Sequence, residues 1–324
     1  MFGRCLQYKR NITSKTVLNN CYLPKKNQEE ATIVFVNKGV NLISICEEKN
    51  ITISEYTIMC EVEESGLSRL EIIEKMRKNL NIMKEAAEYG LTNETKSISG
   101  LIGGDAIKLN RYASSKNTLT GEFMVKAMAR AISCSEVNAA MGKIVAAPTA
   151  GSCGILPAVI ITAGEKLDKT EDELINALFT ASGVGIMIAK NATLSGAEGG
   201  CQAECGAAAA MGAAAVVEMM GGTPSMAIDA AAIVIKNILG LVCDPVAGLV
   251  EVPCAKRNIA GAVSALTTAD LVMSGVTSRI PFDDTVIAMY KVGKQLPCEL
   301  RETAMGGLAT TPTGLKLAKQ ILSK

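Results

Sequence analysis

The chain has 324 residues, enough for one large domain or two medium domains with a sizeable core. Its 33 Lys and Arg residues nearly cancel its 32 Asp and Glu residues, and aromatic residues make up only 3 %, so neither charge nor stacking favours nucleic-acid binding. The chain contains no histidine, which excludes Ser–His and Cys–His nucleophile pairs, histidine-ligated zinc and histidine general bases of its own.

The first 28 residues contain six Lys or Arg residues and no acidic residue. We interpret residues 1–35 as a basic N-terminal extension that is poorly ordered, although a transit peptide has a similar composition. Residues 36–324 show no later linker and are expected to form one domain.

Helical patterns dominate that domain, and the only candidate strand is "TIVFV" at 32–36. Residues 51–91 predict a helical hairpin whose turn is "SGLS" at 65–68, and a short helix is expected to begin near Asp105. Seven further helices are predicted, at 122–135, 156–166, 171–190, 204–220, 225–241, 258–274 and 283–294. The predicted fold is therefore predominantly α, a single compact helical domain with Gly-rich interrupting loops.

The mean hydropathy is positive, +0.26, so a membrane bundle has to be considered. The longest charge-free stretch, 144–164, is long enough to span a bilayer, but Pro148, Pro157 and a Gly-Ser-Cys-Gly turn interrupt it. We therefore expect buried helices and no membrane span. Eleven cysteines without a secretory signal indicate a reducing compartment, the cytoplasm.

Three cysteines fall in Gly- or Pro-containing loops: Cys201 in "SGAEGGCQAECG", Cys243 in "LVCDPVAG" and Cys254 in "EVPCAKRN". Thiolates gathered in a reducing compartment suit a soft metal or an iron–sulfur cluster. Ordinary buried cysteines remain the alternative, because the spacing contains neither C-x2-C nor a ferredoxin-type run.

From about residue 36 to the end, nearly nine tenths of its length, the chain resembles the α subunit of the iron–sulfur-dependent L-serine dehydratase (L-serine ammonia-lyase) family, and five longer segments carry the resemblance. They are "SGLIGGDAIKL" (99–109), "EVNAAMGKIVAAPTAGSCGILPAVI" (136–160), "SGAEGGCQAECGAAAAM" (195–211), "CDPVAGLVEVPCAKRN" (243–258) and "LRETAMGGLATTP" (300–312). The resemblance implies three cluster ligands spaced C-x41-C-x10-C, which Cys201, Cys243 and Cys254 match. Other cysteines, including Cys205 and Cys153, are interpreted as packing.

By the same resemblance, the cofactor is a [4Fe–4S] cluster with one iron free of protein ligands, which acts as a Lewis acid on the hydroxyl of L-serine. Backbone N–H groups and hydroxyls ahead of a helix favour anions, so two loops are candidate substrate sites. The alternative is that both loops are plain turns, as most loops of small residues are. The residues proposed to bind substrate are Thr149, Ser152 and Gly154 in one loop and Ser99, Gly100, Gly104 and Asp105 in the other. Arg301 is a candidate carboxylate clamp, unless it pairs with Glu302 at the surface, and Lys108 is a second candidate catalytic residue.

The missing histidine implies a partner. Members of this family carry an "SSHTxGP"-type segment on a β domain or β subunit, and the chain lacks that segment. A separate β subunit is therefore expected, in an αβ unit that dimerises. The alternatives are a related β-eliminating lyase such as an L-cysteine desulfidase, and a non-enzymatic redox protein whose cluster has four protein ligands.

Overall fold

The computed structural model describes residues 33, 35–115 and 117–323. The expected basic extension at 1–35 therefore lies outside the described residues, apart from residues 33 and 35. The described chain is helical and contains no strand, which confirms the predicted fold class. Residues 33, 35 and 36 of the candidate strand have no strand structure.

The predicted hairpin is present. It consists of α3 (Ile53–Ser65) and α4 (Arg69–Thr92), and Ser68 begins α4 with a capping box in which Glu71 reaches back to the Ser68 backbone. The sequence analysis did not predict the helix before it, α2 (Gly39–Lys49).

The remaining helices comprise the predicted ones in the predicted order, most with shifted ends, and two that the sequence analysis did not predict, at 196–199 and 312–322. They are α5 (Asp105–Ala113), α6 (Gly121–Ala139), α7 (Ile155–Lys166), α8 (Glu171–Asn191), α9 (Gly196–Gly199), α10 (Ala207–Met219), α11 (Pro224–Ile238), α12 (Cys254–Met273), α13 (Phe282–Gln295) and α14 (Pro312–Leu322). Short 3-10 turns lie at η1 (Ala150–Ser152), η3 (Val246–Gly248), η4 (Cys298–Leu300) and η5 (Gly307–Thr310), and η2 (Gln202–Gly206) is π-helical.

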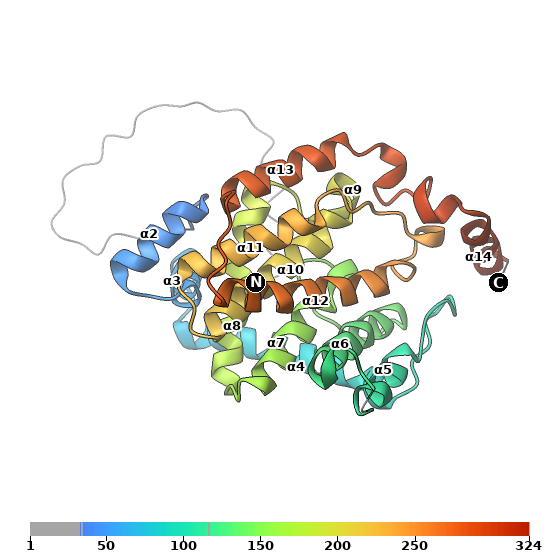
Figure 1. Cartoon of the computed structure of the whole chain (residues 1–324), viewed down its shortest axis with the longest axis horizontal. Coiled ribbons are helices and arrows are strands. Elements are labelled where there is room, and N and C mark those ends of the chain that lie inside the picture. The colour runs from blue at the N-terminus through green and yellow to red at the C-terminus, as the bar shows by residue number, and fades with distance from the viewer. Residues whose placement is uncertain (1–32, 34, 116, 324) are drawn as a thin grey trace.

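Helix α10 forms the centre of the molecule, and α7, α8, α11 and α12 pack around it (Figure 1). Residues 207–217 of α10 are all buried and consist mainly of alanine. Small side chains let the surrounding helices approach the α10 backbone closely, which explains why this part of the sequence is so poor in large residues.

One helix of the described chain, α8, is long and apolar enough to cross a membrane. Its most apolar window is 72 % buried inside the protein, as expected of a core helix. Helix α14 stands at one end of the molecule against η3 and η5 (Figure 1).

Candidate metal centre

Cys201 lies where the chain enters the π-helical segment η2, just before α10. Its side chain is buried. Gly200 has a φ of 75°, and a Cβ at this position would lie 2.8 Å from the carbonyl oxygen of Leu241, so only glycine fits the turn. Single π-helical turns occur frequently at functional sites.

Cys243 is buried and is clasped by the chain around Arg301. The Cys243 N–H donates to the Leu300 carbonyl at 2.8 Å, and the Glu302 N–H donates to the Cys243 carbonyl at 2.7 Å. Glu302 has a φ of 65°, a conformation that is unusual for a residue other than glycine and is often found near functional sites. The backbone therefore fixes the C-terminal loop beside Cys243.

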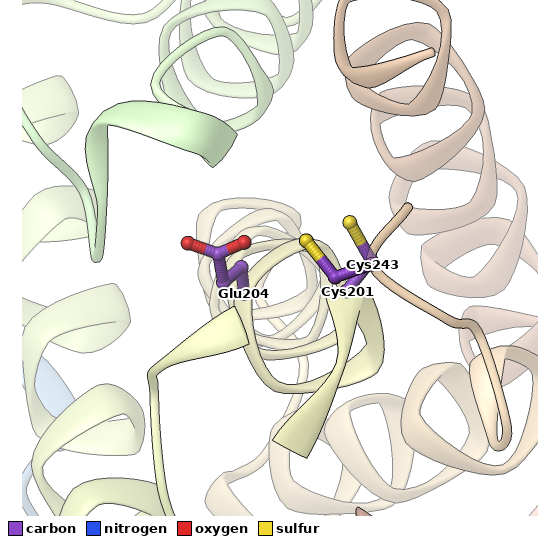
Figure 2. Close-up of side chains that lie close together, drawn as sticks. All are labelled: Cys201, Glu204 and Cys243. Atoms are coloured by element: carbon purple, nitrogen blue, oxygen red, sulfur yellow. The ribbon is translucent and has the colours of Figure 1, made fainter. Parts of the chain in front are cut away.

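These elements bring together a buried set of three metal-ligating groups. The Cys201 sulfur, a Glu204 carboxylate oxygen and the Cys243 sulfur all lie within 4.8 Å of one another. Figure 2 shows Cys201 and Glu204 on the same helical segment, with Cys243 approaching from a neighbouring loop. A side chain on Gly196 would intrude here, because its Cβ would lie 2.6 Å from Glu204 Oε2 and 3.2 Å from Cys243 Sγ.

The surroundings of Cys201 favour its thiolate. Hydrogen bonding by the Cys205 and Cys243 thiols lowers the Cys201 pKa, and the Arg257 guanidinium lowers it further. Arg257 Nη1 lies 3.6 Å from Cys201 Sγ. The pKa of Cys243 is raised, mainly because its thiol donates to Cys201 and because it is buried. Cys205, which the sequence analysis assigned to packing, is thus buried beside the site and acts on Cys201.

Two carboxyl groups face the thiolate. Burial, followed by the charge of Cys201, raises the pKa of Glu204 to about 8. The same two causes raise the pKa of Glu302. Both groups therefore hold a proton more readily than an exposed glutamate.

Arg257 is fixed by two further contacts. Its Nη1 donates to the Val242 carbonyl at 2.8 Å, and its Nη2 donates to Asp244 Oδ1 at 2.8 Å. The other Asp244 oxygen accepts the Leu308 N–H at 2.7 Å. A continuous set of polar contacts therefore joins Cys201 to the C-terminal segment.

Cys254 is the first residue of α12 and is buried. The sequence analysis placed the start of this helix at residue 258, because Pro253 and Cys254 were assigned to the preceding loop. The Cys254 sulfur lies outside the three-atom set described above. Burial and then the charge of Cys201 raise the Cys254 pKa to about 12, so the two sulfurs interact electrostatically.

The predicted substrate loop at 149–154 lies against this centre. Asn258 Nδ2 donates to the Gly151 carbonyl at 2.7 Å, and Asn258 Oδ1 accepts the Gly154 N–H at 2.9 Å. A Cβ on Gly151 would lie 3.3 Å from Glu204 Oε1, and hydrogen bonding from Thr149 opposes the rise in the Glu204 pKa. Thr149 and Gly151 therefore border the Cys–Glu set.

The other two predicted residues of this loop have internal partners. Ser152 is buried, with its hydroxyl 3.2 Å from that of Thr149. The Gly154 N–H is already bound by Asn258, so neither group is free for a ligand in this conformation.

The predicted loop at 99–105 lies beside the start of α12, next to Cys254. Ser99 Oγ donates to Glu251 Oε2 at 2.6 Å, and Lys256 Nζ donates to Asp105 Oδ2 at 2.6 Å. Lys108, a predicted catalytic residue, donates to Asp105 Oδ1 at 2.9 Å and is 74 % exposed. These contacts place the loop near Cys254 but do not bring it to Cys201.

The two glycines of this loop shape the backbone. Gly100 has a φ of 80° and donates its N–H to Ser97. Gly104, with a φ of 71°, is the residue from which α5 begins. Both positions require glycine for conformation, which is independent of any role in substrate binding.

The Arg301 guanidinium has its Nε buried without a hydrogen-bond partner among the described residues. No ion pair joins Arg301 to Glu302 in the described chain, and Glu302 is directed by its own contacts toward Ala197 and Cys201. A buried donor without a partner is uncommon and suits a bound anion.

Sequence reasoning missed Glu204, Arg257, Asp244, Glu302 and Asn258 as site residues. Four of them lie within four residues of a predicted cysteine ligand, so proximity along the chain was the available signal. Glu302 carried no such signal, because only the backbone clasp to Cys243 brings it to the site.

The family model described as "Serine dehydratase alpha chain" matches residues 48–309. A probable L-serine dehydratase alpha chain from Bacillus subtilis is 51 % identical over 280 residues, 86 % of this chain and 93 % of the relative. The L-serine dehydratase alpha chain of Peptoniphilus asaccharolyticus is 46 % identical over 289 residues, 89 % of this chain and 99 % of the relative.

Relatives named simply L-serine dehydratase are longer. One from Escherichia coli, L-serine dehydratase 1, is 34 % identical over 284 residues, which are 84 % of this chain but only 61 % of the relative. These longer proteins contain a portion that the matched region does not include.

Proposed function

Because the chain belongs to the serine dehydratase alpha chain family, we propose that it is the α subunit of an L-serine ammonia-lyase that converts L-serine to pyruvate and ammonia. The observation that carries the proposal is the buried set of Cys201, Cys243 and Glu204, which lies next to the predicted substrate loop at 149–154. Loss of water from serine requires removal of an α-proton and departure of a poor leaving group, so the site has to stabilise developing negative charge.

The donor set fits an iron–sulfur cluster. Three buried cysteines come from three separate segments of the chain, the surroundings of Cys201 favour its thiolate, and soft thiolates are the usual ligands of such clusters. We propose Cys201, Cys243 and Cys254 as ligands of a [4Fe–4S] cluster. When bound, a cluster held by three thiolates supplies one iron that can act as a Lewis acid on the substrate hydroxyl.

The chain's own residues then have separate tasks. Arg257 supports the Cys201 thiolate by charge and by direct contact. Glu204, with its raised pKa, holds a proton at its carboxyl group next to the site. The Arg301 guanidinium, whose Nε has no partner among the described residues, is the group we assign to the substrate carboxylate. The Thr149 hydroxyl, which is bonded to Glu204, borders the same space.

The loop at 99–105 has a supporting task in this proposal. The Ser99–Glu251 and Asp105–Lys256 contacts hold it against the first turn of α12, where Cys254 lies. The Lys108 ammonium donates to Asp105, so we propose that it positions this loop rather than contacting the substrate.

A second chain completes the enzyme in this proposal. This chain has no histidine, and two relatives of nearly equal length are named alpha chains. We therefore propose a β subunit that supplies a histidine-containing segment, in an αβ unit that dimerises in the cytoplasm.

Anaerobic co-expression with a β-type chain tests the proposal. The purified complex should contain about four irons and four sulfides per α chain and should form pyruvate from L-serine. Preference for L-cysteine over L-serine would instead support a desulfidase. A reversible redox couple without lyase activity would contradict the proposed function.

A further inference from the structure

The tightest set of ligand atoms in the described chain has the dimensions of a site for a single metal ion. The sulfurs of Cys201 and Cys243 and a carboxylate oxygen of Glu204 lie within 4.8 Å of one another, and all three residues are buried. Zinc binds thiolate sulfur at about 2.3 Å and carboxylate oxygen at about 2.0–2.2 Å, so neighbouring ligands of one tetrahedral ion lie about 3.4–3.8 Å apart. Side-chain shifts of about 1 Å would bring all three atoms onto one ion.

An iron–sulfur cluster makes a different demand, because each cysteine ligand binds a different iron. Cys254 belongs to the proposed cluster set but lies outside the tight group, whereas Glu204 lies inside it. The two sets therefore share Cys201 and Cys243 and differ in the third ligand.

The surroundings leave the three ligand atoms available to a cation. Within the described residues, Glu204 has no Lys or Arg at salt-bridge distance, and the Arg257 guanidinium that contacts Cys201 is already paired with Asp244. Metal ligands bind in their deprotonated form, so an ion would take the place of the protons that Cys243 and Glu204 otherwise hold.

We infer that the cluster-free chain binds one zinc ion through Cys201, Cys243 and Glu204, with the fourth position open to water. Zinc and the cluster then exclude each other, because they need the same two sulfurs. Zinc bound after cluster loss would therefore block cluster reassembly. Zinc binding itself does not require the proposed function. Only the competition between zinc and the cluster rests on it.

Cobalt serves as a spectroscopic probe for zinc in the full-length chain, stripped of metal with a chelator and kept reduced under anaerobic conditions. We expect one equivalent of Co²⁺ per chain, sulfur-to-cobalt charge-transfer absorption in the near ultraviolet, and displacement of the cobalt by Zn²⁺. Cys201→Ser and Cys243→Ser should abolish this absorption, and Glu204→Gln should weaken zinc binding at least tenfold.

Two matched variants separate the zinc set from the cluster set. Cys254→Ser should bind zinc within threefold of the wild type yet fail to assemble a cluster from iron and sulfide. Glu302→Gln, a neighbouring acid outside the set, should also bind zinc normally. Circular-dichroism melting verifies that each variant is folded.

Absence of a stoichiometric site would overturn the inference, as would a Cys254→Ser variant that loses zinc or a Glu204→Gln variant that binds it normally. If the wild type assembles a cluster but binds no zinc, only the zinc site is wrong. If it binds zinc but assembles no cluster, the zinc site stands and the proposed function is wrong.

Discussion

Replacing Asn258 with alanine should destabilise the loop that borders the metal centre. Asn258 is fully buried, and its side chain binds the Gly151 carbonyl at 2.7 Å and the Gly154 N–H at 2.9 Å. Alanine leaves both backbone groups without a partner, and each such group costs about 1–3 kcal/mol when buried. Because Gly151 is only half-buried and water can reach its carbonyl, we expect a total loss of about 2–4 kcal/mol in the free energy of unfolding.

Urea denaturation followed by circular dichroism measures this loss, and an unchanged dependence on urea would show that the unfolded state is unaffected. Asn138→Ala is the matched control, because Asn138 donates to Ala150 of the same loop only at 3.4 Å and in an exposed position. The control should lose less than about 1 kcal/mol. If Asn258→Ala were no less stable than Asn138→Ala, the idea that Asn258 anchors this loop would be refuted.

Three further predictions concern the centre itself. Arg257→Leu leaves the Asp244 charge buried and unpaired and should lower the free energy of unfolding by about 3–5 kcal/mol. Arg69→Leu, at an exposed ion pair, should lower it by less than about 1 kcal/mol. Urea denaturation measures both losses, and equal losses would contradict the role of Arg257 as the buried partner of Asp244. The folded Glu204 pKa of about 8 lies above its unfolded value, so the contribution of Glu204 to stability is complete below about pH 4.5 and is lost as the pH rises toward 8. In the cluster-free chain, Glu204→Gln should therefore remove a slope of up to about 1.4 kcal/mol per pH unit from the free energy of unfolding. An unchanged pH profile of stability would show that the Glu204 pKa is not raised. Gly196→Ala should lower iron incorporation severalfold, because its Cβ would crowd Glu204 and Cys243. Gly206→Ala, whose Cβ would have its nearest neighbour 3.6 Å away, should incorporate iron normally. Iron and sulfide analysis compares the two variants, and equal loading would argue against a crowded centre.

Local signals explain which helices the sequence predicts well. Ser68 and Thr170 each begin a helix with a capping box, and the predicted starts of α4 and α8 agree with the structure. Helix α12 was placed four residues late because Pro253 was taken to be part of the loop, whereas it immediately precedes the first helical residue. Helices α2 and α14, each of 11 residues and largely exposed, went unpredicted, although the apolar residues of α14 gather clearly on one face.

The site was predictable only in part, because several of its residues meet through contacts between distant parts of the chain. The family resemblance, through its cysteine spacing, indicates the candidate ligands. The approach of Glu204 to Cys243, in contrast, depends on a π-helical turn and on a loop about forty residues away along the chain. Glu302 reaches Cys201 only because two backbone hydrogen bonds clasp residues 243 and 300–302 together. Such contacts depend on tertiary structure, which a single sequence does not state.

The contacts from Arg257 through Asp244 to Leu308 also set an order of events during biosynthesis. A ribosome synthesises the chain from its N-terminal side, so residues 300–308 emerge after Cys201, Cys243 and Cys254. Until they do, Cys243 lacks its backbone clasp and Asp244 lacks one of its two partners. Maturation of the centre therefore has to wait until residues 300–308 have left the ribosome, and a nascent chain stalled before this segment would remain immature.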